Sequence, residues 1–235
     1  MENSEHTSKQ YDLELETLRT RVLLMGELVE RQVRLAIEAL INGDVTLMNR
    51  IIDDDRQVNA MEVGIDQSCS HIIARRQPTA GDLRKVMMVI KTITDLEQIG
   101  DEAKNIALMA KNLYQKRNLA LPRFDKIKYA SNLTLEMLLK SLDAFANLDV
   151  STVSQVVHQD EQVDEEFRNI IRYLITYMME DPRTISSALE ILFVAKAIER
   201  IGDHAKNISE YVVYMVKGRD VRHVTSDEIE REVQK

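Results

Sequence analysis

The chain carries one motif twice. Residues 96–106 (LEQIGDEAKNI) return as residues 198–208 (IERIGDHAKNI), shifted by 102 positions. Most of these positions are identical, and they include Glu, Asp, Lys and Asn as well as small and apolar residues. An internal repeat at this spacing indicates two copies of one domain-sized unit. Because packing alone would preserve size and hydrophobicity rather than particular carboxylates, the repeated acids are candidate functional residues.

The spacing of apolar residues predicts helices. They recur every three or four positions, as in Leu15, Leu18, Val22 and Met25, which is the period of an amphipathic helix and not of a strand. Short connections between helices make neighbours antiparallel. We therefore predict an all-α fold of two tandem up-down-up three-helix bundles with six long helices. The expected breaks between helices lie near residues 42–44, 77–79, 121–122, 147–149, 181–182 and 217–218.

The breaks also predict the domain organisation. The N-terminal bundle is expected at residues 8–118 and the C-terminal bundle at residues 122–217. Residues 218–235 are expected to form a tail, either as a short last helix or as a frayed end.

Composition excludes several classes of protein. The formal net charge of −8 argues against nucleic-acid binding, which needs clustered Lys and Arg. The single cysteine, Cys69, cannot form an internal disulfide, which fits a reducing compartment. The polar N-terminus lacks the order of a secretion signal, and the apolar runs are shorter than a membrane span requires. We expect a soluble, cytoplasmic protein.

The repeated motif places two acids on one helix face, because residues four apart on a helix project from the same side. In an antiparallel hairpin, residues equidistant from the turn lie side by side. Asn59 and Glu97 are equally far from Pro78, and so are Asp55 and Asp101. These four groups are therefore expected to meet at one height.

The second half gives the same result. Asp164 and Glu199 are equidistant from the junction of residues 181 and 182, as are Asp160 and Asp203. Four such groups would repel one another unless a cation neutralised them, and hard oxygen ligands favour Mg²⁺, Mn²⁺, Ca²⁺ or iron. A metal site on each bundle is thus one interpretation of the repeat.

Ordinary ion pairing is the alternative interpretation. Lys104 and Lys206 each follow the last acid of the motif by three residues, and Arg56 and Arg200 are close by. Surface pairs of this kind are common and individually weak. Other acids at the same spacing, Asp12 with Glu16 and Glu62 with Asp66, are interpreted as solvated faces.

Two further features of the motif leave alternatives open. Gly100 and Gly202 lie in predicted helix interiors, where glycine costs about 1 kcal/mol relative to alanine. A tight helix crossing or a bound ion would explain their presence in both copies. His204 replaces the Glu102 of the first copy and is interpreted as a surface residue.

The duplicated Asp-x-x-x-Asn/Asp and Glu-x-x-x-Asp pattern resembles the PhoU family of phosphate-signalling regulators. Residues 73–78, 177–185 and 214–220 resemble the same family, and the resemblance runs from about Tyr11 to His223. It implies two three-helix bundles without catalytic activity, which bind metal ions at the acidic motifs. Here those positions are Glu97, Asp101, Glu199 and Asp203, and the hairpin geometry adds Asp55, Asn59, Asp160 and Asp164.

The resemblance also implies a function. Family members link the phosphate ABC transporter, through its ATPase subunit, to a membrane sensor histidine kinase, and they repress phosphate uptake and the phosphate-starvation genes. A homodimer and divalent or iron-type ions (Mg, Mn, Zn or Fe) are expected, with contact to the membrane only through partners. Because Asn59 is uncharged, the first site is expected to carry one charge less than the second.

Two other classes of function compete with this one. A metal-dependent enzyme in a helical bundle usually supplies Glu-x-x-His ligands, and the sequence contains no such element. It also lacks a phosphate loop and a nucleophile elbow. A helical oligomerising scaffold with no metal role is the remaining alternative.

Overall fold

Long helices make up nearly all of the described chain. The computed structural model describes residues 9–115, 124–222 and 224–233, and this part contains no strand. The prediction of an all-α fold with tandem helical bundles is confirmed. The helices are α1 (Lys9–Asn42), α2 (Val45–Arg76), α3 (Ala80–Gln115), α4 (Asp125–Asn147), α5 (Val153–Glu180), α6 (Ile185–Lys217) and the short α7 (Ser226–Val233), with a 3-10 turn, η1 (Pro182–Thr184), before α6.

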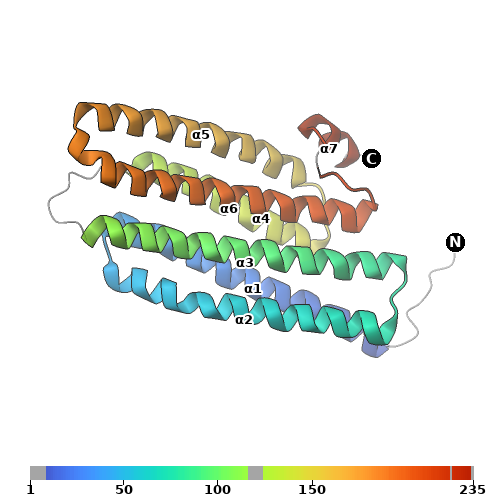
Figure 1. Ribbon diagram of the computed structural model, residues 1–235. Helices are drawn as coiled ribbons and strands as arrows, with labels where there is room; N and C mark the ends of the chain where they lie inside the picture. The colour runs from blue at the N-terminus through green and yellow to red at the C-terminus, as the bar shows by residue number, and fades with distance from the viewer. Residues whose placement is uncertain (1–8, 116–123, 223, 234–235) are drawn as a thin grey trace.

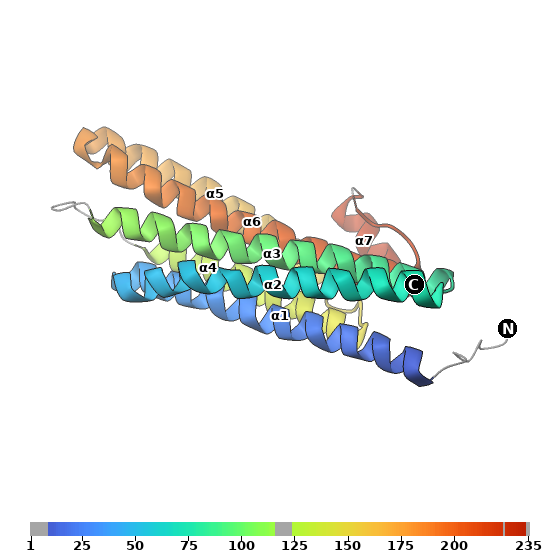
Figure 2. The same ribbon diagram turned by 60° about the horizontal axis from the view of Figure 1, so that its bottom comes forward.

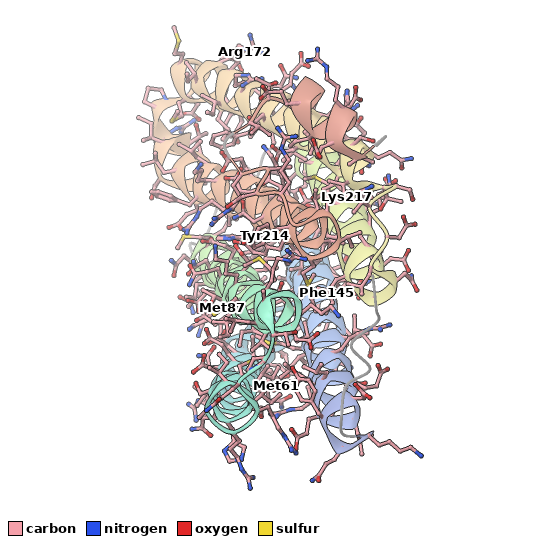
Figure 3. The ribbon with its side chains drawn as sticks, turned by 90° about the vertical axis from the view of Figure 1, so that its right-hand side faces the viewer. Met61, Met87, Phe145, Arg172, Tyr214 and Lys217 are labelled. Atoms are coloured by element: carbon pink, nitrogen blue, oxygen red, sulfur yellow. The ribbon has the colours of Figure 1, made fainter. Side chains whose placement is uncertain are left out.

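The two bundles pack against each other lengthwise. Helices α5, α6, α3 and α2 lie side by side in one layer, with α4 and α1 behind them (Figure 1). The turned view keeps α3 beside α6 (Figure 2). Seen end-on, α1 to α3 form the lower bundle and α4 to α6 the upper one (Figure 3). The α3–α6 contact is therefore the seam of the molecule, with α1 against α4 as a smaller second contact.

The helix ends follow local sequence chemistry. Asp44 caps α2 by accepting a hydrogen bond from the backbone N–H of Leu47 at 3.0 Å. Gly218 ends α6 in the left-handed region at φ 72°, which glycine adopts without strain. Gln77 and Leu148 end α2 and α4 in the same region without that advantage. The predicted breaks are confirmed, except that residues 121–122 lie outside the described residues.

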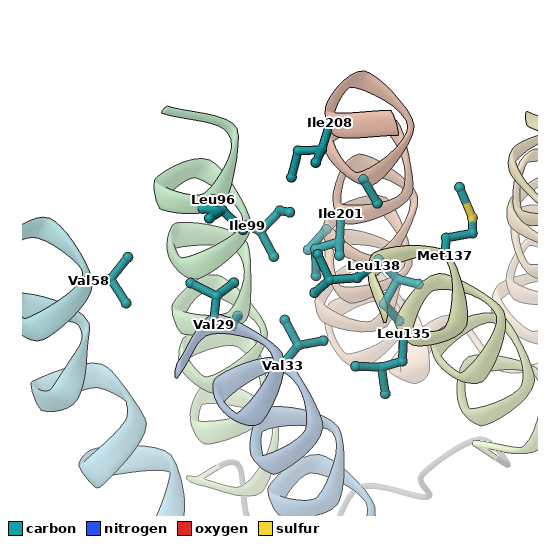
Figure 4. Packing of buried hydrophobic residues seen from close by; sticks show 14 of the residues in the cluster. Val29, Val33, Val58, Leu96, Ile99, Leu135, Met137, Leu138, Ile201 and Ile208 are labelled. Atoms are coloured by element: carbon teal, nitrogen blue, oxygen red, sulfur yellow. The ribbon is translucent and has the colours of Figure 1, made fainter. Parts of the chain in front are cut away.

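A 3-4 spacing of buried residues builds the core. On α2 it runs through Met48, Ile51, Asp55, Val58 and Ile65, so one acid occupies a core position. Apolar side chains from all six long helices form one continuous cluster across both bundles, and Figure 4 shows part of it. Because the two bundles share this core, the acidic positions on α3 and α6 are held in a fixed relation.

The C-terminal tail forms the short helix α7 on the outside of α5. Ile229 packs with Val153, Val157, Val213 and Val221 in a small apolar cluster separate from the main core. Of the two expectations for this segment, the short last helix is the one observed. In the described part of the chain, none of the helices combines the length and apolarity of a membrane span.

Candidate metal centres

The first acidic cluster consists of Asp55 and Asn59 on α2 and Glu97 and Asp101 on α3. Lys104 Nζ lies 2.8 Å from Asp55 Oδ2 and 3.4 Å from Asp101 Oδ1, so it joins the two helices. Asn59 Nδ2 lies 3.5 Å from Asp55 Oδ2. The hairpin thus brings the predicted groups together, with an ammonium group between the carboxylates.

Burial and repulsion between neighbouring carboxylates raise the pKa of acids in and beside this cluster. Partial burial raises the pKa of Glu97, and the neighbouring Asp101 and Asp55 raise it further. Glu62 behaves in the same way: burial raises its pKa first, followed by the charges of Glu97 and Asp66. Glu62, interpreted from its spacing as part of a solvated face, is thus half-buried and close enough to the cluster to feel its charges.

The second acidic cluster consists of Asp160 and Asp164 on α5 and Glu199 and Asp203 on α6. Lys206 Nζ lies 2.7 Å from Asp160 Oδ2, which repeats the Lys104–Asp55 pair of the first cluster. Lys196 pairs with Glu199 on the same helix. Each bundle therefore pairs the first aspartate of its cluster with a lysine, and in the first bundle this lysine also reaches Asp101.

Asp203 is the most perturbed acid of the second cluster. Although more than a third of its surface is exposed, partial burial of its carboxyl group raises its pKa to about 6, together with the charges of Glu199, Asp160 and Asp164. Burial also raises the pKa of Asp160, against the effect of its partner Lys206. Acids held in this way favour either a proton or a cation.

Both interpretations of the repeat can be compared with this arrangement. The lysine pairs predicted from spacing are present. Among the described residues, no group of three or more His, Cys, Asp or Glu side chains has the arrangement that a metal ion requires. However, Asp55 Oδ1 and Asn59 Oδ1 are buried without a hydrogen-bond partner among the residues that the structure describes, and unpaired buried oxygens of this kind fit a hard cation. The eight residues remain predicted ligands.

Polar contacts between α3 and α6 lie along the seam, next to the two clusters. His204 Nδ1 lies 2.6 Å from Asp95 Oδ1, and Arg200 Nη1 lies 2.5 Å from Glu102 Oε1. Asp95 and Glu102 are buried. The interpretation of His204 as a surface residue is wrong, because the antiparallel packing of α3 and α6 brings it against Asp95. The two clusters consequently stand at the same level on either side of the seam.

A further acid, Glu210, was not identified from the sequence. It is 6% exposed, and it lines a cavity of about 630 Å³ beside Asp203. Burial raises its pKa to about 7, with Lys206 opposing the shift and Asp160 adding to it. Its place two turns after Asp203 on α6 is the only sequence signal that could have indicated it.

Packing explains one of the two glycines of the motif. A Cβ on Gly100 would meet Val58 Cγ1 at 3.2 Å, and one on Gly202 would meet Val163 Cγ1 at 3.6 Å. Both glycines are buried and face side chains of the neighbouring helices. A close helix crossing therefore accounts for Gly100, whereas a methyl group at Gly202 would make only ordinary van der Waals contacts.

Fold and site together define a class of protein: an all-helical tandem repeat with one lysine-compensated acidic cluster per repeat. The PhoU domain family model matches residues 22–110 and 127–212, one match in each bundle. The chain belongs to the PhoU family, and the resemblance noted from the motifs is confirmed.

Curated relatives and solved structures that resemble this chain are also PhoU proteins. The phosphate-specific transport system accessory protein PhoU of Escherichia coli (strain K12) is 46% identical over 228 residues, which is 97% of this chain and 94% of the relative. The Pseudomonas aeruginosa homolog is 43% identical over 230 residues, covering 97% of this chain and 94% of the relative. The crystal structure of PhoU from that species aligns with a TM-score of 0.85 at 43% identity, over 89% of this chain and 100% of the other. The phosphate transport system regulatory protein PhoU of Streptococcus pneumoniae aligns with a TM-score of 0.82 at 29% identity, over 90% of this chain and 99% of the other.

Proposed function

We propose that this chain is a regulatory accessory protein of a phosphate transport system, which represses phosphate uptake and the phosphate-starvation regulon. The observation that carries this proposal is the match along almost the whole chain, over both repeats, to relatives that bear that name. The protein acts as an adaptor and not as an enzyme. It works in the cytoplasm, a reducing compartment that suits its single cysteine, Cys69, which is buried and not in a disulfide.

The proposed partners are the ATPase subunit of the phosphate ABC transporter and a sensor histidine kinase. By holding the kinase in its phosphatase mode when phosphate is plentiful, the adaptor keeps the response regulator inactive. It reaches the membrane only through these partners, and it works as a homodimer. The long exposed faces of the helices supply the surface that such contacts need.

Cation binding is the proposed physical basis of the adaptor. The ion would be held by Asp55, Asn59, Glu97 and Asp101 in the first bundle, and in the second by the equivalent acids Asp160, Asp164, Glu199 and Asp203. When bound, a divalent or iron-type ion would supply positive charge to an otherwise acidic face, which favours an acidic partner loop or a phosphate group. The unpaired buried oxygens of Asp55 and Asn59 and the raised pKa of Glu97 support this proposal. Lys104 and Lys206 already neutralise part of the charge, so the ion competes with them.

A reporter of the phosphate-starvation regulon tests the proposal in cells that lack the chromosomal gene. We expect the wild-type chain to repress the reporter at high phosphate, while a variant with Glu97→Gln, Asp101→Asn, Glu199→Gln and Asp203→Asn fails to do so although it is folded. Capture of the transporter ATPase and of the kinase by the tagged chain, at high and low phosphate, is the matching biochemical assay. Full repression by the variant would remove the acidic clusters from the mechanism.

A second candidate function is a helical oligomerising scaffold with no metal role. Ile185, Leu189 and Phe193 are exposed apolar side chains at four-residue spacing on α6 and suit pairing of two protomers. The lysine pairs would then be sufficient to neutralise the acids. Metal analysis of protein purified without chelator separates this candidate from the cation-binding adaptor.

A further inference from the structure

The two bundles differ at one buried position beneath the repeated motif. Gln32 on α1 is 4% exposed, and its Oε1 lies 3.6 Å from the place that a Cβ on Gly100 would take. In the second bundle Met137 occupies the equivalent place, with its Cε 3.7 Å from a Cβ on Gly202. A polar amide thus stands in the first bundle where the second has an apolar thioether.

The Gln32 amide has no partner among the described residues. In that part of the chain neither Gln32 Oε1 nor Gln32 Nε2 makes a hydrogen bond, although both atoms are buried. Leaving a buried polar group unpaired costs about 1–3 kcal/mol, so a chain gains stability by avoiding it. Each such group in a folded protein therefore calls for an explanation, such as a bound ion or water.

The unpaired atoms of the first cluster lie at the same level as Gln32. Gln32 and Asp55 are nearly equidistant from the turn at Gly43 that joins the antiparallel α1 and α2, so they stand opposite each other. Asp55 shares the core-facing side of α2 with Val58, which points toward α1 and α3 (Figure 4). Asp55 Oδ1 and Asn59 Oδ1 are also buried and unpaired, whereas in the described part of the chain Asp160 and Asp164 have no such atom.

We propose that Gln32 is an inner ligand of the first cluster, so that α1 joins α2 and α3 in binding one hard divalent cation such as Mg²⁺ or Mn²⁺. The inference rests on the proposed cation binding. Hard cations take carboxylate and amide oxygens together, and the unpaired oxygens of Gln32, Asp55 and Asn59 are of these kinds. The second bundle, with Met137 in this place, binds its ion through α5 and α6 alone.

This difference makes the two sites unequal. The first site reaches into the bundle core and includes neutral oxygens from Gln32 and Asn59, while the second is more exposed at Asp203 and holds only carboxylates.

The test disables the second site and then substitutes Gln32 in the first. In a chain with Glu199→Gln and Asp203→Asn, which disables the second site, Mn²⁺ affinity is measured by calorimetry for the parent and for Gln32→Met, Gln32→Glu and Met137→Gln. We expect Gln32→Met to weaken Mn²⁺ binding by about tenfold or more. Gln32→Glu keeps an oxygen and should bind at least as tightly as the parent, while Met137→Gln should leave the affinity unchanged. Thermal unfolding in chelator reports the structural effect of each change separately.

The outcomes separate a ligand from a structural residue. In chelator, Gln32→Met should be at least as stable as the parent, because it removes two unpaired buried atoms. If Gln32→Met binds Mn²⁺ as tightly as the parent, Gln32 is not a ligand and this inference alone is overturned. If the wild-type chain binds no Mn²⁺, the proposed cation binding fails, and the inference fails with it.

Discussion

Replacing Glu210 with glutamine should stabilise the protein at alkaline pH. Glu210 is 6% exposed and lies beside a cavity, and burial raises its pKa to about 7. Because the folded chain holds this proton more tightly than the unfolded chain, the free energy of unfolding falls as pH rises from about 4.5 to about 7. Above about pH 7 the charged carboxylate lowers the free energy of unfolding by an amount that no longer changes with pH.

The magnitude follows from the size of the shift. Glu210 rises from 4.5 to about 7, and each unit corresponds to about 1.4 kcal/mol, so the charged form destabilises the fold by up to about 3 kcal/mol. A glutamine removes this charge but buries an amide that needs hydrogen bonds, which offsets about 1 kcal/mol. We therefore expect Glu210→Gln to be more stable than wild type by about 2 kcal/mol near pH 8 and to lose the advantage near pH 4.

Urea unfolding at several pH values, in the presence of chelator, measures this difference. Glu165→Gln, an exposed glutamate on α5, is the matched control and should change stability by less than about 0.5 kcal/mol. Equal stability of Glu210→Gln and wild type near pH 8, or an unchanged pH dependence, would refute the reasoning.

Three further changes test the packing and the charge pairs. Gly202→Ala should raise the free energy of unfolding by about 0.5–1 kcal/mol, because alanine favours the helix and the new methyl group would lie 3.6 Å from Val163, an ordinary contact. Gly100→Ala should raise it less or lower it, because the new methyl group would lie only 3.2 Å from Val58. Equal effects of the two substitutions in urea unfolding would contradict this. Lys206→Met removes the ammonium group that lies 2.7 Å from the buried Asp160, so in the presence of chelator it should lower the free energy of unfolding by about 3 kcal/mol. Added Mn²⁺ should restore part of this stability. If Mn²⁺ does not shift the unfolding transition of this variant in a calorimetric scan, the lysine and the ion do not occupy the same site. Ile229→Asp should detach α7 from its apolar cluster and speed limited proteolysis after residue 218 without lowering the main unfolding transition; unchanged cleavage would show that α7 does not depend on this contact.

The number of long helices, and the level along each helix hairpin at which the acids of the motif lie, could be predicted from the sequence. The turn signals at residues 42–44 and 77–79 are local, and the rise of a helix is fixed, so distance from a turn places Asp55 against Asp101. Both lysines of the clusters could be identified for the same reason.

Residues that depend on packing between distant helices could not be predicted. His204 meets Asp95 only because α3 packs against α6, and no local pattern specifies that seam. Glu62 has the spacing of a solvated pair with Asp66, yet it is half-buried and close to Glu97 of the neighbouring helix. Gln32 resembles any polar residue of a long helix until its burial is known. The domain boundaries and the metal role of the eight predicted ligands remain predictions.

Equilibrium dialysis of the wild-type chain against Mn²⁺ tests the central claim most directly. One ion per acidic cluster predicts binding of two Mn²⁺ per chain, and the variant with Glu97→Gln, Asp101→Asn, Glu199→Gln and Asp203→Asn should bind none. Undiminished binding by the variant, or no binding by the wild-type chain, would contradict the account.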